Sequence, residues 1–286
     1  MLSTIDWSTD IYVTYIFWKD QKKMYYMLSI AMLVGSMVLS LLLVFCQNRK
    51  MSTRRVLAEM LVVLVGLKPA VDAFRVGSGH KIMEGQLVDP VTEMNLLKGI
   101  EMFAEAIPGV IIQLSAILSD GKASDPAIAS LAISALTTGF TSATISYDYD
   151  TDPRRCHFCP QFYGYVPSGS TKRTVLFITM MLLSAIILLV RTLILVLFGL
   201  VSKSAALIYI CTDIGIYLLF KVLRQDFTYW MPFEGPLSII MSVIFRIMVK
   251  VIVDFTALVH FRHPYEGNVY SSLSGAFISY HSIFLC

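Results

Sequence analysis

Apolar runs of membrane-spanning length constrain this chain more than any other feature. The run TVLFITMMLLSAIILLVRTLILVLFGLV covers residues 174–201 and contains a single charged residue, Arg191. A helix needs about 20 consecutive apolar residues to cross the hydrocarbon core of a bilayer. Because similar runs recur along the whole length, the sequence predicts an all-α, polytopic transmembrane helical bundle. Residues 1–286 are expected to form one transmembrane domain.

Composition supports a membrane environment and argues against some partners. The chain is 56% hydrophobic and only 15% charged, whereas soluble domains carry about 25% charged residues. The formal net charge of +3 is too small to favour nucleic acid as a partner. Membrane lipids are therefore the expected partners, and the chain is predicted to be an integral, multi-pass membrane protein.

Basic loops define the expected topology. Residues 47–55 contain Arg49, Lys50, Arg54 and Arg55, and the long polar loop 146–173 is also basic, so both are predicted to be cytoplasmic, as are the two termini. Three full crossings between these loops would place them on opposite sides of the membrane. The conflict disappears if 98–118 is a re-entrant helical hairpin hinged at Pro108 and Gly109. About seven full spans are then expected, with a weaker apolar segment at 269–286.

Charged residues inside the apolar segments are the strongest functional signal. Arg246, Lys250 and Asp254 lie four residues apart, so on a helix they form one stripe. Glu101 and Glu105 have the same spacing but carry like charges, and need a cation or a proton. The stripe is therefore expected to face these two carboxylates, or water, inside the bundle. The charged positions within or beside apolar segments are Glu59, Lys68, Asp72, Glu101, Glu105, Arg191, Asp213, Lys221, Arg246, Lys250 and Asp254.

Two interpretations of these charges stay open at the level of sequence. They could be structural ion pairs that fix the packing of the helices, since buried charges pair whether or not they have another role. They could instead line a polar track through the bundle that passes lipid headgroups or ions, because ionisable residues within spans commonly mark transport pathways.

Three sequence features resemble the XK-related family of multi-pass membrane proteins. Segment 5–46 has two acids, Asp6 and Asp10, followed by aromatic residues, a polar turn and a long apolar helix. The pattern E-x-x-x-E-x-x-P-x-x-x-x-Q covers Glu101, Glu105, Pro108 and Gln113, and a helix rich in small residues then ends in SYDYD. The stretches YLLFKVLRQDFTYWMP and VKVIVDFTALVHFRHPYE also resemble an uncharacterised group of protist multi-pass proteins.

The resemblance implies a role in lipid handling. Several XK-related proteins scramble phospholipids between leaflets, and others work beside partner proteins, including bridge-type lipid transporters. Carried over by position, Asp6, Asp10, Glu105, Gln113 and Arg191 would line a polar interior. The chain departs from the family pattern at Gly109, where glutamine is usual.

Other motifs give little support for metal or enzyme chemistry. The pair Cys156 and Cys159 lacks a second ligand pair for zinc. The start of a calcium-binding loop is matched by Asp148, Asp150 and Asp152, but Pro153 occupies the position where such a loop requires glycine. These aspartates are therefore weak metal candidates, and a solvated acidic loop is expected instead. No nucleotide-binding or hydrolase motif is present, and neither enzymatic activity nor a cofactor is expected.

The leading hypothesis is a phospholipid scramblase-like protein, alone or with a membrane or lipid-transfer partner. Headgroups would move along a polar groove while the acyl chains remain in the bilayer. The alternatives are an ion channel or solute transporter, and a structural subunit of a larger membrane assembly. The residues expected to line the groove are Asp6, Asp10, Glu101, Glu105, Gln113, Arg191, Arg246, Lys250 and Asp254.

Overall fold

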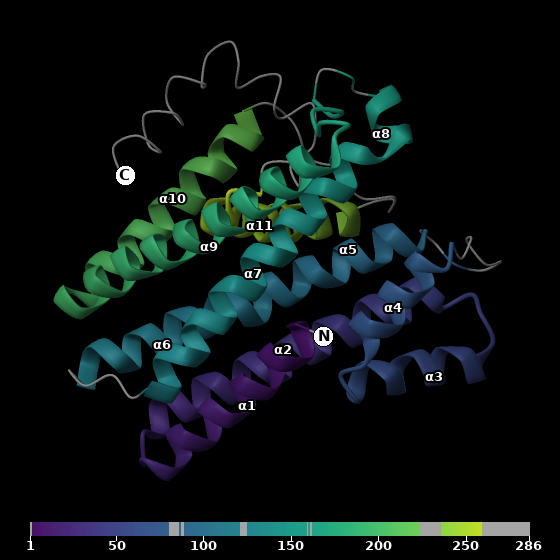
Figure 1. The fold of residues 1–286 in the computed structure, drawn as a ribbon. Coiled ribbons are helices and arrows are strands. Elements are labelled where there is room, and N and C mark those ends of the chain that lie inside the picture. The colour runs from purple at the N-terminus through teal and green to yellow at the C-terminus, as the bar shows by residue number, and fades with distance from the viewer. Residues whose placement is uncertain are drawn as a thin grey trace.

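The computed structural model shows a bundle of long helices (Figure 1). It describes residues 2–79, 86, 89–120, 125–158, 160, 162–223 and 236–258. These residues form helices and no strand, which confirms the predicted all-α fold. The elements are α1 (Leu2–Lys19), α2 (Lys23–Asn48), α3 (Thr53–Leu64), α4 (Lys68–Gly77), α5 (Pro90–Glu101), the π-helical segment η1 (Met102–Ala106), α6 (Ile107–Asp120), α7 (Asp125–Thr151), α8 (Pro153–Phe158), α9 (Ser170–Val201), α10 (Lys203–Leu223) and α11 (Pro236–Thr256).

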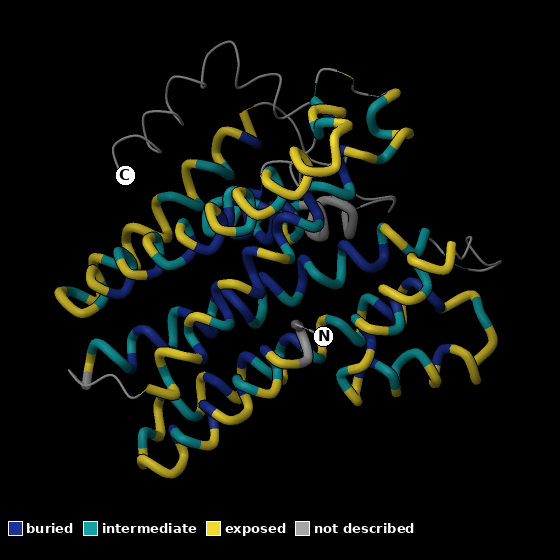
Figure 2. Tube along the Cα trace, viewed as in Figure 1, coloured by how far each residue is buried: buried dark blue, intermediate teal, exposed yellow. Residues whose placement is uncertain are grey.

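Five helices in the described part are long and apolar enough to cross a membrane. They are α2, the continuous helix Pro90–Ser119, α7, α9 and α10. Their outer surfaces expose large apolar side chains, including Leu42 on α2, Ile186 on α9 and Phe220 on α10, as expected for surfaces that face lipid (Figure 2). The polytopic architecture is thus confirmed, whereas the total of seven spans stays a prediction. The expected segment 269–286 and the C-terminus lie outside the described residues.

The predicted re-entrant hairpin at 98–118 is wrong, because this segment belongs to one uninterrupted helix. We call this helix, which runs from Pro90 to Ser119 through α5, η1 and α6, helix 90–119. Near its start, Glu93 accepts a hydrogen bond from Gln47 at the end of α2. Near its end, Ser119 bonds to Tyr25 at the start of α2. The helix therefore runs antiparallel to α2 from one end of the bundle to the other.

The π-helical segment explains how the helix tolerates proline. Pro108 has no N–H, and its ring clashes with the carbonyl four residues earlier, so an α-helix would kink or break there. The amide of Ile107 instead bonds to the carbonyl of Met102, five residues back, which widens the turn just before the proline. Gly109 is not a hinge either. A Cβ at this position would lie 3.3 Å from Met32 Sδ and 3.6 Å from Asp10 Oδ2, so the glycine permits close packing.

The segment 56–76, which was expected to span the membrane, is too short in the structure to do so. It forms two short helices, α3 and α4, that turn back at Gly66, whose φ is +74°. At 1.5 Å per residue, helices of 12 and 10 residues measure about 18 and 15 Å, too short for a core of about 30 Å. We refer to residues 53–77 as the α3–α4 hairpin.

The two basic loops still lie at one end of the bundle, although the short segment between them is 56–76 and the long helix is 90–119. Helix 90–119 and α7 each run the length of the bundle and the hairpin does not, so the loop after α2 and the loop after α7 lie at the same end of the bundle (Figure 1). The two basic loops are thus on one side, as expected, but the segment between them that is too short to span is 56–76 rather than 98–118. That this end faces the cytoplasm stays a prediction.

The centre of the bundle lies where α7, α9, α11 and helix 90–119 meet. Its buried core includes Met102, Ile145, Leu188 and Ile252, which are at most 1% exposed. Between α7 and α9 the backbones come so close that a Cβ on Gly139 would lie 2.3 Å from the carbonyl oxygen of Met181. Small residues allow this approach, which is common between helices in membranes.

Candidate functional site

Helix 90–119 carries a row of polar side chains along one side. Asn95, Lys98, Glu101, Glu105 and Gln113 are separated by three, three, four and eight residues, so they follow the same side of the helix. The 18 residue-to-residue steps from Asn95 to Gln113 rise about 27 Å, close to the thickness of the hydrocarbon core, about 30 Å. This polar face therefore extends across most of the depth that a membrane would present.

The two glutamates lie on one face of helix 90–119. Residues four apart are neighbours on a helix surface, and the π-helical segment between Glu101 and Ile107 keeps the helix continuous here. Glu101 and Glu105 both line one cavity of about 100 Å³. The predicted pairing of these two carboxylates on one face is confirmed.

Two acids from α1 join this face, as the sequence indicated. Asp10 accepts a hydrogen bond of 3.0 Å from Gln113 Nε2 and lies within electrostatic range of Asp6, Glu101 and Glu105. Asp6 and Asp10 are 5% and 3% exposed. The structure thus gathers Asp6, Asp10, Glu101, Glu105 and Gln113 into one cluster, here called the acidic cluster.

The acidic cluster is held by neutral hydrogen-bond donors. Ser134 Oγ on α7 donates to Asp6 over 2.7 Å, and Ser36 Oγ on α2 donates to Glu105 over 2.8 Å. Neutral donors orient a carboxylate without cancelling its charge. The cluster can consequently present carboxyl oxygens to a cationic group that enters the bundle, with protons released where that group binds.

The cavity beside this cluster presents both signs of charge. Lys98 and Lys68 line it together with Glu101, Glu105 and Asp72, and Ser36 and Ser40 add hydroxyl groups from α2. Lys98 also lies within electrostatic range of Asp148 on α7. A cavity lined by both ammonium and carboxyl groups is chemically suited to a zwitterion that carries a phosphate and an amine.

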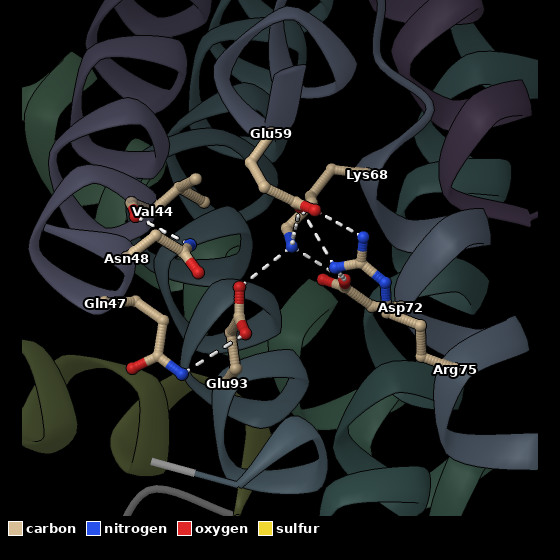
Figure 3. Close-up of polar contacts among 8 residues, drawn as sticks. All are labelled: Val44, Gln47, Asn48, Glu59, Lys68, Asp72, Arg75 and Glu93. Atoms are coloured by element: carbon tan, nitrogen blue, oxygen red, sulfur yellow. Dashed lines mark hydrogen bonds and ion pairs between the residues drawn. The ribbon is translucent and has the colours of Figure 1, made fainter. Parts of the chain in front are cut away.

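A charge network fixes the α3–α4 hairpin beside the cavity (Figure 3). At its centre Lys68 Nζ bonds to Asp72, Glu93 and Glu59 over 2.7, 2.8 and 3.1 Å. Arg75 bonds to Glu59 through both terminal nitrogens. Lys68 is 4% exposed, so these bonds compensate a buried ammonium group.

Protonation in the hairpin follows from this network. Burial raises the pKa of Asp72 to about 6, because Lys68 offsets only part of the desolvation. Burial would also raise the pKa of Glu59, but the bonds from Arg75 and Lys68 outweigh it and hold that pKa below its usual value. Desolvation would lower the pKa of Lys68, yet Asp72 and Glu93 raise it overall. Asp72 is thus the group in the hairpin that can exchange a proton near neutral pH.

Part of the predicted groove lies elsewhere. Lys250 on α11 bonds over 2.5 Å to Asp254 on its own helix and to Asp213 on α10. The stripe from Arg246 to Asp254 was expected to face Glu101 and Glu105, or water, whereas the partners of Lys250 are Asp254 and Asp213. Lys250 thereby joins α11 to α10, and Asp254 pairs with it within α11.

The two arginines of the predicted groove differ in their surroundings. Arg246 is 2% exposed on α11, a helix that packs against η1. Arg191 is half-buried on α9, and in the described part of the chain no ion pair reaches it. No bond of the acidic cluster described above involves Arg191, so its place in a groove stays a prediction.

The three aspartates weighed as calcium ligands have separate structural roles. Helix α7 extends to Thr151, so Asp148 and Asp150 are helical rather than part of a loop. Asp150 accepts the amides of Gly164 and Val166, and Asp152 pairs with Arg155. Within the described residues no group of three such side chains is arranged to hold a metal ion.

Sequence reasoning missed several residues of this site. Lys98 was overlooked because it lies at the boundary of an apolar segment, and Ser36 and Ser134 because hydroxyl groups are common in spanning helices. The position of Lys98, three residues before Glu101, was the signal that could have identified it. Glu93 could not be found, since its partners Lys68 and Gln47 lie on other helices.

Together, the spanning helices and the charged interior define a polytopic helical membrane protein with a polar face inside its bundle. The family model described as XK-related protein matches residues 1–274. The chain belongs to the XK-related family, as its sequence motifs indicated. Searches of curated proteins and of solved structures found no match.

Proposed function

We propose that this chain moves phospholipids between leaflets, with headgroups travelling along the polar face of helix 90–119. Membership of a family linked to lipid scrambling supports this function. The observation that carries the proposal is the extent of the polar face, which covers about 27 Å of helix from Asn95 to Gln113. A path for headgroups must extend over such a depth, whereas structural ion pairs need not.

The chemistry of the face matches a zwitterionic headgroup. Lys98 offers a cation to the phosphate, and Glu101, Glu105 and Asp10 offer carboxylates to the amine. A lone charge costs about 2.5–3.5 kcal/mol at the centre of a membrane on insertion scales. Successive charged partners lower this barrier for the headgroup, while the acyl chains remain in the bilayer.

The test is lipid scrambling by the purified protein in liposomes, measured as dithionite quenching of fluorescent lipids, with calcium and with chelator. Wild type is expected to allow quenching beyond the outer leaflet. Replacing both Glu101 and Glu105 by glutamine is expected to slow flipping by about tenfold or more, equivalent to about 1.4 kcal/mol in the barrier. The matched control is Asp254→Asn, which removes a carboxylate that pairs with Lys250.

Normal flipping by the folded double variant would contradict this route. If wild type itself gives quenching confined to the outer leaflet under both conditions, an ion channel or a structural subunit becomes the better assignment. A partner involved in lipid transfer, and the expected lack of enzymatic activity, stay predictions from the sequence.

A further inference from the structure

We propose that the α3–α4 hairpin is a movable wall of the cavity and that Glu93 is the latch that holds this wall closed. The inference rests on the proposed function in one respect: it concerns regulation of the cavity that would admit headgroups. The movement of the wall itself can be measured without any lipid transport.

The hairpin supplies one side of the cavity. Val63, Gly66, Lys68, Pro69 and Asp72 all line it from α3, α4 and the turn between them. The opposite side comes from α2 and from helix 90–119, including Ser40 and Glu101. Moving the hairpin outward as a unit would therefore open the cavity along this side.

Charged contacts hold the hairpin together as one body. Glu59 on α3 bonds to Lys68 and Arg75 on α4, and Asp72 on α4 bonds to Lys68. Arg75 also lies 3.7 Å from Asp72. Each of these partners belongs to residues 53–77, so these pairs would persist if the hairpin moved.

Helices α3 and α4 pack against α2 and α5, and among the described ion pairs one carboxylate connects the charge network to the rest of the bundle. Among the described ion pairs of Lys68 and Arg75, the pair between Lys68 and Glu93 is the one that leaves the hairpin. Glu93 Oε1 accepts this bond over 2.8 Å, and Oε2 accepts a longer one of 3.4 Å from Gln47 on α2. Glu93 is 3% exposed, so it joins three helices from a buried position (Figure 3).

The balance of charge allows the Glu93 bond to be removed without unfolding the hairpin. Glu59, Asp72 and Glu93 supply three negative charges against the two positive charges of Lys68 and Arg75. Replacing Glu93 by glutamine leaves two of each, and Lys68 keeps Glu59 and Asp72. The substitution thus weakens attachment to α5 without leaving an uncompensated cation in the hairpin.

The experiment measures how fast a thiol reagent reaches the cavity. Ser40→Cys is introduced on the α2 wall, the protein is placed in lipid nanodiscs, and maleimide labelling is followed with and without Glu93→Gln. The parent protein without Ser40→Cys gives the background from native cysteines. Labelling at position 40 is expected to be about tenfold faster in Glu93→Gln, the change expected for loss of one charge-assisted hydrogen bond.

Two controls separate latch release from general loosening. Asp72→Asn also removes a carboxylate from Lys68 but leaves the Glu93 bond, so labelling at position 40 is expected to be no faster than in the parent. Ser204→Cys, at the exposed start of α10, is expected to react equally in all backgrounds. Equal labelling at position 40 in Glu93→Gln and in its parent overturns the proposal.

If Glu93→Gln no longer unfolds cooperatively on heating, that variant has lost its fold, and Gln47→Leu becomes the deciding change. It removes the second bond to Glu93 without altering charge and is expected to accelerate labelling at position 40 alone; no acceleration overturns the latch. The dithionite assay then separates the two proposals. Faster labelling of position 40 with unchanged lipid flipping supports the latch and contradicts the lipid route. Altered lipid flipping with unchanged labelling supports the lipid route and contradicts the latch.

Discussion

The close approach of α7 and α9 predicts that one added methyl group will destabilise the bundle. A Cβ on Gly139 would lie 2.3 Å from the Met181 carbonyl oxygen and 3.2 Å from Ala185 Cβ. Because the first contact is with backbone, no side-chain rotation can relieve it. The two helices must separate by about 1 Å for Gly139→Ala to reach ordinary van der Waals distance.

The magnitude follows from two losses. Overpacking of this kind costs about 1–3 kcal/mol. The bond of 3.0 Å between Ser142 Oγ and Ser184 Oγ lies one turn further along the same pair of helices, so it would lengthen and break. A net loss of about 0.5–1.5 kcal/mol is typical of one hydrogen bond. A total of about 2–4 kcal/mol corresponds to a fall in Tm of about 5–15 °C.

The assay is thermal unfolding of the purified protein in detergent, followed by intrinsic fluorescence. The matched control is Gly35→Ala on α2, where an added Cβ meets no atom within 4 Å. This control gains helix propensity of about 1 kcal/mol and should unfold at or above the wild-type Tm. If Gly139→Ala unfolds at the same temperature as Gly35→Ala, the reasoning from helix contact is refuted.

Two further predictions concern charged groups of the α3–α4 hairpin and of α11. Because the pKa of Asp72 is raised to about 6, closure of the hairpin is favoured when this group is protonated and is weakened as pH rises through 6. Labelling of Ser40→Cys should therefore be slower near pH 5 than near pH 7.5, after correction by a thiol outside the cavity, and Asp72→Asn should remove this difference. Replacing Lys250 by methionine leaves Asp213 and Asp254 without their shared cation. It should lower Tm by about 2–4 °C or more while lipid flipping persists, and abolished flipping with unchanged Tm would place Lys250 in the path instead.

The sequence was sufficient for the fold class and for the centre of the candidate site. Long apolar runs require helices in a bilayer, because every backbone polar group must be satisfied internally. The acids Glu101 and Glu105 lie on one helix at a spacing that fixes their common face. Asp10 and Gln113 came together as the family pattern implied.

The local sequence around Pro108 could not predict the backbone conformation there. Proline followed by glycine is compatible with a turn, with a kink, or with a π-helical segment that absorbs the missing hydrogen bond. The outcome was decided by Met32 and Asp10, which pack against Gly109 from other helices. Likewise, the apolar run 56–76 is long enough to span, but Gly66 with a positive φ turns it back on itself.

Partners of the remaining charges were decided by tertiary structure. Lys250 pairs with Asp213 on the preceding helix rather than with Glu101 and Glu105, which were its expected partners. Spacing within a helix determines which charges share a face, but not which neighbouring helix that face meets. Lys68 shows the same limit, because Asp72 was predictable from spacing, whereas Glu59 and Glu93 were not.

Because helix 90–119 runs the full length of the bundle, the segments that link the helices differ in length between the two ends. At one end the links are residues 20–22, 121–124 and Ser202, a few residues each. The other end carries the α3–α4 hairpin and the long link that includes α8 (Figure 1). Among the described residues, an enzyme that modifies the chain, or a soluble protein that docks on it, therefore finds most of the backbone outside the long helices at one end of the bundle, the end where the Glu93 network lies.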